Sequence, residues 1–169
     1  MADRVPPELG QLSTLKILDA SENDLSGSIP PELGNLSGLE LLALDQNRLS
    51  GPLPPELGNL RALEDLVLRN NLVDGPIPPE LGNMRSLQQL DLAENGLTGA
   101  LPPELGSIGL LRTLSIAGNP LAGPLPGTLT RLTLESFHWN DTDLCAPTDD
   151  AFQEWLNSID DHLGDENCS

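Results

Sequence analysis

Leucine residues recur along this chain at a fixed spacing and alternate with polar positions. Within residues 30–53, Leu39, Leu42 and Leu44 form the group L-x-x-L-x-L, which returns with small apolar replacements every 24 residues. The alternation from Leu42 to Leu44 predicts a short β-strand whose two leucines point inward and whose middle residue points outward. One such unit cannot bury its leucines by itself, whereas stacked units can. The pattern therefore predicts a solenoid of stacked coils.

A second motif, Pro-Pro-Glu-Leu-Gly, keeps the same interval. It begins at Pro6, Pro30, Pro54, Pro78 and Pro102, and a degenerate sixth copy begins at Pro126. The prolines suit an extended backbone, and Glu-Leu-Gly predicts a short helical turn with its acid at the favoured N-terminal end. We therefore expect each coil to carry a strand on one side and a helical turn on the other.

Two further positions recur between the strand and the helical turn. They are occupied by Asn23, Asn47, Asn71, Asn95 and Asn119, and by Gly27, Gly51, Gly75, Gly99 and Gly123. A side-chain amide can satisfy buried main-chain groups of a turn, which an apolar side chain cannot do. The glycines mark the next bend, where we expect unusual dihedral angles.

The composition changes near the C-terminus, where all the aromatic residues lie: Phe137, Trp139, Phe152 and Trp155. The chain divides into residues 1–5, a remnant or a cloning-derived addition, residues 6–137, the repeats, and residues 138–169, a cap. Apolar residues at helical spacing predict a helix over about 149–163 that closes the last coil. A sugar-stacking role for Trp139 or Trp155 is the alternative interpretation of these aromatics.

The two cysteines, Cys145 and Cys168, flank the predicted helix. A disulfide between them would close a loop of about 23 residues and stabilise the cap by about 3 kcal/mol. A metal site is the alternative, but His162 is the single further ligand candidate nearby. The disulfide predicts an oxidising compartment, and hence a secreted or cell-surface protein. The first residues lack an apolar segment, so a secretory signal is expected to be absent or already removed.

The repeat as a whole, L-x-x-L-x-L-x-x-N-x-L-S/T-G-x-I/L-P, resembles the plant-specific class of leucine-rich repeats. Similar repeats occur in receptor-kinase ectodomains, polygalacturonase-inhibiting proteins and many secreted bacterial and algal proteins. The resemblance runs from about Val5 to Trp139, and the stretch from Leu144 to Leu156 resembles the cap of secreted bacterial and algal members. It implies an α/β fold: a right-handed solenoid with a parallel sheet on its concave face, helical or 3-10 turns on its convex side and a C-terminal capping helix.

The N-terminus departs from the pattern of this class, whose members usually open with a cysteine-containing or Trp-rich cap. This chain begins within a coil, at the Pro-Pro turn. An uncapped solenoid exposes a leucine edge. We therefore expect either a truncation or a contact of this edge with another chain, self-association included.

The charge balance narrows the range of partners. The chain has 26 Asp and Glu against 8 Lys and Arg, a formal net charge of -18. This charge disfavours nucleic acid and anionic membrane surfaces, and no apolar run approaches the roughly 20 residues that a membrane-spanning helix needs. A basic partner is favoured electrostatically, although the same excess is also typical of a salt-adapted or highly soluble surface.

No group of residues indicates catalysis. His138 and His162 belong to no recognisable motif, and the chain has no Gly-rich phosphate loop, zinc motif or nucleophile elbow. The repeated acids of the Pro-Pro-Glu motif would stack roughly 5 Å apart, yet a calcium site needs several oxygens converging from one loop. We expect no enzyme activity, no cofactor and no metal.

In the family that the repeat resembles, the concave face of the sheet carries binding. Reading the outward positions coil by coil gives the candidate ligand-binding residues Ile17, Asp19, Leu41, Ala43, Asp45, Asp65, Val67, Arg69, Gln89, Asp91, Thr113, Ser115 and His138. These positions vary while the framework does not, which identifies the positions that the fold leaves free. A solvated face without a ligand is the alternative interpretation. Arg69 is the chief anchor, and Ile17, Leu41, Ala43 and Val67 form an apolar strip.

The sequence thus predicts a non-catalytic recognition module that binds a protein or peptide on its concave face. A carbohydrate or cell-wall binder would carry aromatic platforms, which the repeats lack. A structural or ice-binding surface would need a regular row of threonines, but the corresponding residues are Ser26, Ser50, Asp74, Thr98 and Ala122.

Overall fold

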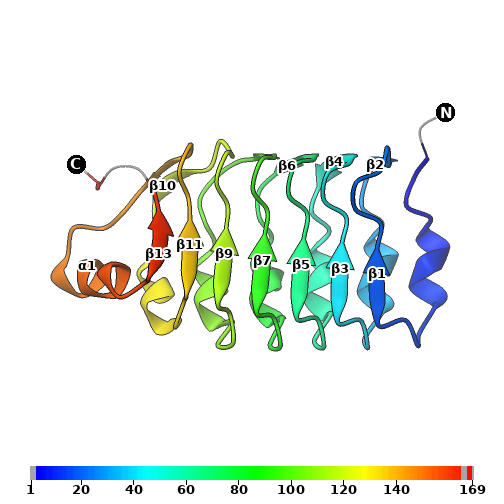
Figure 1. The fold of residues 1–169 in the computed structure, drawn as a ribbon, viewed down its shortest axis with the longest axis horizontal. Helices are drawn as coiled ribbons and strands as arrows, with labels where there is room; N and C mark the ends of the chain where they lie inside the picture. The colour runs from blue at the N-terminus through cyan, green and yellow to red at the C-terminus, as the bar shows by residue number, and fades with distance from the viewer. Residues whose placement is uncertain (1–2, 165–166, 169) are drawn as a thin grey trace.

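The computed structural model describes residues 3–164 and 167–168, which form a solenoid of stacked coils. In each coil a short strand on the concave face is followed by a turn, a second short strand and a 3-10 helix on the convex side. The coils follow one another along the long axis, so that the first coil and the C-terminal helix lie at opposite ends (Figure 1). The predicted fold class is confirmed.

Seven parallel strands form the concave sheet in the order in which they occur along the chain. They are β1 (Ile17–Asp19), β3 (Leu41–Ala43), β5 (Asp65–Val67), β7 (Gln89–Asp91), β9 (Thr113–Ser115), β11 (Ser136–His138) and β13 (Asp161–Leu163). Each strand pairs with the strand at the same place in the neighbouring coil, residue by residue, so Leu42 pairs with Leu18 on one side and with Leu66 on the other. Equivalent side chains therefore form columns that run across the sheet.

Shorter strands pair along a second edge of the coils. A four-stranded sheet and a two-stranded one comprise β2 (Ser26–Gly27), β4 (Arg48–Pro52), β6 (Leu72–Gly75) and β8 (Gly96–Leu97), and β10 (Ala122–Pro124) with β12 (Asp143–Cys145). The recurring glycine of this edge has a positive φ in every coil, from 76° at Gly75 to 105° at Gly123. Glycine adopts this conformation without a steric penalty, as the sequence predicts.

Each Pro-Pro-Glu-Leu-Gly motif begins a 3-10 helix on the convex side. These helices and the degenerate sixth are η1 (Pro7–Gln11), η2 (Pro31–Asn35), η3 (Pro55–Asn59), η4 (Pro79–Asn83), η5 (Pro103–Ser107) and η6 (Gly127–Arg131). The glycine of the motif allows neighbouring helices to approach closely, because a Cβ atom at Gly58 would overlap the main-chain carbonyl of Glu80 in the next coil. Glycine is required there because it has no side chain. Its φ lies outside the left-handed region, so the conformation alone would accept other residues.

The interior holds the leucines of the repeat. Leu39, Leu42 and Leu44 expose none of their surface, and their equivalents in the following coils are also buried. Burying one such side chain stabilises the fold by about 1.5–3 kcal/mol. Because every coil contributes the same set, the core is one continuous column of aliphatic side chains.

The recurring asparagines link successive coils by hydrogen bonds. Asn71 Nδ2 donates to the carbonyl oxygens of Leu68 in its own coil (3.1 Å) and Leu44 in the preceding coil (2.9 Å). Its Oδ1 accepts from the N–H of Leu49 at 2.9 Å. Asn47, Asn95 and Asn119 repeat this pattern. The predicted role of the amides is confirmed, and the ladder also joins each coil to its neighbour.

The predicted helix of the cap is wrong in its C-terminal part. Helix α1 spans Asp150–Asn157, and the Asp149 side chain caps it by accepting from the Phe152 N–H at 3.0 Å. Residues 161–163, assigned to the helix by the sequence pattern, instead form β13, which pairs with β11. Ile159 follows the helical spacing because it is buried beneath the cap, although it lies outside the helix. An added strand satisfies the free edge of β11, which a longer helix would leave unpaired.

The aromatic residues close the C-terminal end of the core, as predicted. Phe137, Trp139 and Phe152 are buried, and the Phe137 and Trp139 ring centroids lie 4.5 Å apart. The disulfide between Cys145 and Cys168 is also present, with the two Cα atoms 4.9 Å apart. The Cys168 N–H donates to the Ala146 carbonyl at 2.9 Å, so the bridge and this bond fasten the C-terminal segment beside α1.

We predict that Asn71→Ala lowers the free energy of unfolding by about 3 kcal/mol, because it removes hydrogen bonds to buried main-chain groups of two coils. The matched control is Asn23→Ala in the first coil. The exposed Asn23 amide donates to the carbonyl oxygens of Ala20 and Ser21, both in its own coil. We expect a loss of about 1 kcal/mol for this control. Urea unfolding followed by circular dichroism measures both. Equal losses at the two positions would contradict a stabilising role of the inter-coil bonds.

We also predict that Gly58→Ala destabilises the protein by about 2 kcal/mol, since the new methyl group forces neighbouring 3-10 helices apart. Gly109→Ala is the control, because no heavy atom beyond its two chain neighbours lies within 4 Å of a Cβ atom at this position. It should change the free energy of unfolding by less than about 0.5 kcal/mol. Thermal and urea unfolding compare the two variants, and a neutral Gly58→Ala would show that the helices can separate without loss.

Candidate binding surface

The concave sheet brings the candidate ligand-binding residues onto one surface. Each lies in a strand of this sheet or two residues after one. The register aligns one column of outward positions through Ile17, Leu41, Asp65, Gln89 and Thr113, and a second through Asp19, Ala43, Val67, Asp91, Ser115 and His138. The structure extends the first column with Ser136 and Asp161 and the second with Leu163. The predicted alignment of these residues is therefore observed, whereas their contact with a ligand stays a prediction.

The predicted residues differ in how much surface they offer. Ile17, at the open end of the sheet, exposes 60% of its surface, and Arg69 is also exposed. Ala43 exposes only 8%, so it adds little surface to the predicted apolar strip. Its methyl group is short, and its register partners Asp19 and Val67 flank it on both sides. The apolar part of the surface therefore comes mainly from Ile17, Leu41 and Val67.

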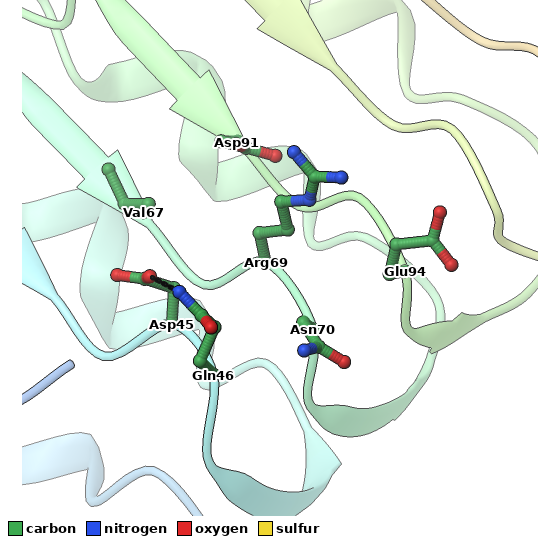
Figure 2. Close-up of a pocket in the computed structure, with 7 residues that line it drawn as sticks. All are labelled: Asp45, Gln46, Val67, Arg69, Asn70, Asp91 and Glu94. Atoms are coloured by element: carbon green, nitrogen blue, oxygen red, sulfur yellow. Dashed lines mark hydrogen bonds between the residues drawn. The ribbon is translucent and has the colours of Figure 1, made fainter. Parts of the chain in front are cut away.

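A shallow depression of about 610 Å³ lies near the middle of the concave face. Figure 2 shows its lining, which comes from three successive coils: Asp45, Gln46, Val67, Arg69, Asn70, Asp91 and Glu94. Asp45, Val67, Arg69 and Asp91 are candidate residues from the sequence. The depression therefore joins the polar residues that end β3, β5 and β7 around one apolar side chain.

Three lining residues belong to a further column of outward positions in the repeat, but not to the predicted ligand-binding set: Gln46, Asn70 and Glu94. They occupy the same place in successive coils and have positive φ values of 53°, 55° and 56°. This left-handed conformation is uncommon for residues other than glycine and turns each side chain at the end of its strand. The next coil carries Gly118 at this place, and a Cβ atom there would lie 2.8 Å from the Glu94 carboxyl carbon. The sequence indicates this turn position, because it recurs in successive coils and is once occupied by a glycine, Gly118.

The electrostatics of the depression centre on Arg69 and the carboxylates around it. The Arg69 side chain extends toward Asp91, and Asp45 accepts a long hydrogen bond from Gln46 Nε2 at 3.4 Å (Figure 2). Burial raises the pKa of Asp91 above its usual value, and the charge of Asp45 adds to this effect. The Ala93 N–H, Arg69 and Ser115 act in the opposite direction. Asp91 is thus a carboxylate that a positively charged group would stabilise in its ionised form.

A second polar cluster lies at the C-terminal end of the sheet. Asp161 Oδ2 is 3.0 Å from the Ser136 hydroxyl and 3.1 Å from His138 Nε2. These contacts lower the pKa of Asp161, that from His138 having the largest effect. A nucleophilic serine needs an imidazole that takes its proton while a carboxylate holds the other ring nitrogen. Here Asp161 bonds to both partners through the same oxygen, so the cluster fastens β13 to β11 and does not form such a relay.

The sugar-stacking interpretation of Trp139 is wrong, because Trp139 exposes only 2% of its surface. It lies between Phe137 and the His162 ring, with which it is stacked at a centroid distance of 6.3 Å. Trp155 is half-buried and donates from Nε1 to the Leu132 carbonyl at 2.9 Å. Both indole rings are therefore structural parts of the C-terminal cap.

Within 3–164 and 167–168, no cluster of three or more His, Cys, Asp or Glu side chains is arranged to hold a metal ion. In the same part of the chain, no helix combines the length and apolar character needed to cross a bilayer.

Solved structures with this fold include receptors and an ice-binding protein. A plant peptide hormone receptor, RGFR1, in complex with RGF2 shares 30% identity at a TM-score of 0.90, over 97% of this chain and 27% of that one. A second structure is the leucine-rich-repeat ectodomain of the membrane receptor kinase GASSHO1/SCHENGEN3 from Arabidopsis thaliana, in complex with Casparian strip integrity factor 2. It shares 30% sequence identity at a TM-score of 0.81, over 99% of this chain and 24% of that one. A plant ice-binding protein shares 28% sequence identity at a TM-score of 0.85, over 98% of this chain and 53% of that one. This chain thus spans from about a quarter to about half of these structures.

The repeats themselves match a family model. No curated protein sequence matches the chain. The model described as Leucine Rich Repeat matches more than half of the chain, in the segments 14–36, 38–60, 62–84, 86–108 and 110–132. The chain therefore belongs to the leucine-rich-repeat family, and its repeats are of the plant-type class.

Proposed function

We propose that this protein is a non-catalytic recognition module that binds a protein or peptide on its concave face. The observation that carries the proposal is the depression around Arg69, which combines one cation, three carboxylates, two amides and the apolar Val67. Such a mixture suits a peptide, because it offers partners for main-chain amides as well as for charged side chains. Arg69 and Val67 are its proposed anchors, and Asp45, Asp91 and Glu94 its proposed specificity residues.

The charge of the depression supports a basic partner. Three carboxylates face one guanidinium, and the whole chain carries a formal net charge of -18. A field of this sign accelerates the approach of cationic peptides and disfavours anionic ones. Burial of Asp91 adds to the preference, since a ligand cation would offset the desolvation of that carboxylate.

The comparisons support the same class of partner. The two receptor structures described above are complexes with RGF2 and with Casparian strip integrity factor 2, and one of them is an ectodomain. By analogy, we place this protein outside the cell, in agreement with its disulfide. The analogy concerns the class of ligand, because this chain covers about a quarter of either receptor structure.

Carbohydrate or cell-wall binding is less well supported. Sugar-binding surfaces use exposed aromatic rings as platforms, and the aromatic residue of the concave strands, Phe137, is buried. Trp139 is likewise buried within the cap. An ice-binding role is also less well supported: a plant ice-binding protein shares the fold, but the row Ser26, Ser50, Asp74, Thr98 and Ala122 lacks a repeated chemistry.

The first test screens the protein against an array of random peptides in which positive, neutral and negative sequences are equally represented. We expect positive peptides to be enriched. Both Arg69→Glu and Val67→Asp should weaken the selected peptides at least about tenfold, because the loss of an anchor outweighs the attraction gained from an added carboxylate. Arg85→Glu is the matched control, because Arg85 is exposed in the turn between η4 and β7 and its replacement changes the net charge equally. It should leave the selected peptides bound. If Arg69→Glu and Val67→Asp left every interaction intact, the concave site would be wrong.

The second test uses the titration of Asp91 and the best positive peptide from the array. The raised pKa of Asp91 means that this carboxylate takes up its proton earlier than an ordinary aspartate as the pH falls. Loss of its charge should weaken the binding of a cationic peptide, so the dissociation constant is expected to rise between about pH 7 and about pH 4. The Asp91→Asn variant should bind the peptide more weakly at neutral pH, and its dissociation constant should not rise as the pH begins to fall. Titration calorimetry at several pH values measures both, and an unchanged profile in Asp91→Asn would exclude Asp91 from the site.

A further inference from the structure

Three Asn-x-Ser/Thr sequences occur in the chain, and they begin at Asn35, Asn140 and Asn167. This sequence is the acceptor signal for N-linked glycosylation of secreted proteins. A glycan is bulky and hydrated, so a folded protein carries it only where the asparagine side chain reaches solvent. The surroundings of the three asparagines therefore distinguish between them.

Asn35 meets this requirement on the convex side of the solenoid. It is the last residue of η2, and its carbonyl accepts from the Ser37 N–H at 2.9 Å. Leu36 lies between them with φ -78° and ψ 63°, which are the angles of an inverse γ-turn, and its side chain is fully buried. Asn35 and Ser37 are both exposed. The turn thus fixes the middle residue in the core and presents the two residues that define the signal to solvent.

Asn140 is held at the end of β11 on the concave side. Its carbonyl accepts from the Gly118 N–H at 3.0 Å, and its half-buried side chain donates to the Asp141 carboxylate at 2.6 Å. The hydroxyl of Thr142, the third residue of this signal, donates to the Trp139 carbonyl at 2.6 Å. A glycan on Asn140 would displace the contact with Asp141 and stand on the concave face.

Asn167 lies beside the disulfide of the cap. The middle residue of its signal, Cys168, is bonded to Cys145. The Asn167 Oδ1 accepts from Gln153 Nε2 at 3.0 Å, which ties this exposed side chain to α1. The third residue, Ser169, lies outside the described residues. A glycan on Asn167 would break the bond to Gln153 and crowd the bridge.

We infer that Asn35 is an N-glycosylation site and that Asn140 and Asn167 are not. The donor is a lipid-linked oligosaccharide diphosphate, used by an oligosaccharyl transferase of the secretory pathway. Asn35 Nδ2 forms a bond to the anomeric carbon of the sugar and gives up one proton. The bond from that carbon to the diphosphate oxygen breaks, and the lipid diphosphate leaves with its electron pair. This inference rests on the extracellular placement given under the proposed function, because the transferase acts on chains that enter that pathway.

The position of Asn35 also suits the proposed binding surface. The 3-10 helices lie behind the concave sheet in Figure 1, and η2 belongs to the coil that contributes β3. A glycan on Asn35 is therefore on the opposite side of the solenoid from the depression around Arg69. Glycosylation of Asn35 and binding of a peptide are thus compatible.

Secretion of the full chain from cultured mammalian cells, behind a cleavable leader, tests the inference. Peptide-N-glycosidase F in heavy-oxygen water converts each glycosylated asparagine into a labelled aspartate, which peptide mass spectrometry locates. We expect the label at Asn35 and at neither Asn140 nor Asn167. Asn35→Gln and Ser37→Ala should each abolish it. Secreted protein without the label at Asn35, or with a label at either other position, overturns the inference.

The next coil offers a matched variant that adds a site. Asn59 ends η3 as Asn35 ends η2, and Leu60 has nearly the same angles as its counterpart, φ -77° and ψ 71°. The signal is absent there because Arg61 stands where the preceding coil has Ser37. Arg61→Ser should therefore add a second glycan, seen as an increase in intact mass and a label at Asn59. If it adds none, the turn does not present the acceptor, and the inference is wrong.

Peptide binding by the same secreted protein separates this inference from the proposed function. Asn35→Gln lies outside the concave surface, so it should bind the peptides selected on the array with an unchanged dissociation constant. A protein that carries the glycan on Asn35 but binds no peptide contradicts only the proposed function. A protein that binds peptides but lacks this glycan contradicts only the inference about Asn35.

Discussion

The structure depends on satisfying the main-chain groups that each coil buries where its strand turns outward. Asn71 does this by bonding to Leu44 of the preceding coil as well as to Leu68 of its own. Such a bond forms only when the turns of the two coils lie in register. The remainder of a coil can differ in length, since β9 and β11 pair at a spacing of 23 residues. The leucine core supplies most of the stabilising free energy, whereas the amides fix the register between the turns.

The same constraint separates framework from surface. Positions that contact the neighbouring coil must repeat, and positions that point away from the core are free to vary. The depression around Arg69 is an example of such variation, because the positions equivalent to Arg69 in the two following coils hold Ala93 and Ala117. A repeat protein can therefore change its ligand without changing its core, since a substitution on the concave face leaves the buried leucines and asparagines in place.

How much the sequence predicts depends on how often a feature recurs. Strands, 3-10 helices and glycine bends each appear in several copies, so their common pattern identifies them. The end of α1 appears once, and Ile159 continues the apolar spacing of the helix although the chain has already turned toward β13. The concave columns were predictable for the same reason as the strands. The burial of Ala43 was not, because it depends on the sizes of the neighbouring side chains.

A solenoid has no stopping point of its own, because every coil offers its neighbour the surface that it uses itself. Each end therefore requires residues that lie outside the repeat. At the C-terminal end Trp139 fills the space of a further coil, and β13 satisfies the strand edge. At the N-terminal end β1 and the half-buried leucines keep the form of an interior coil. The leucines of the first coil therefore keep a partial exposure that β13 and the aromatic residues remove at the other end.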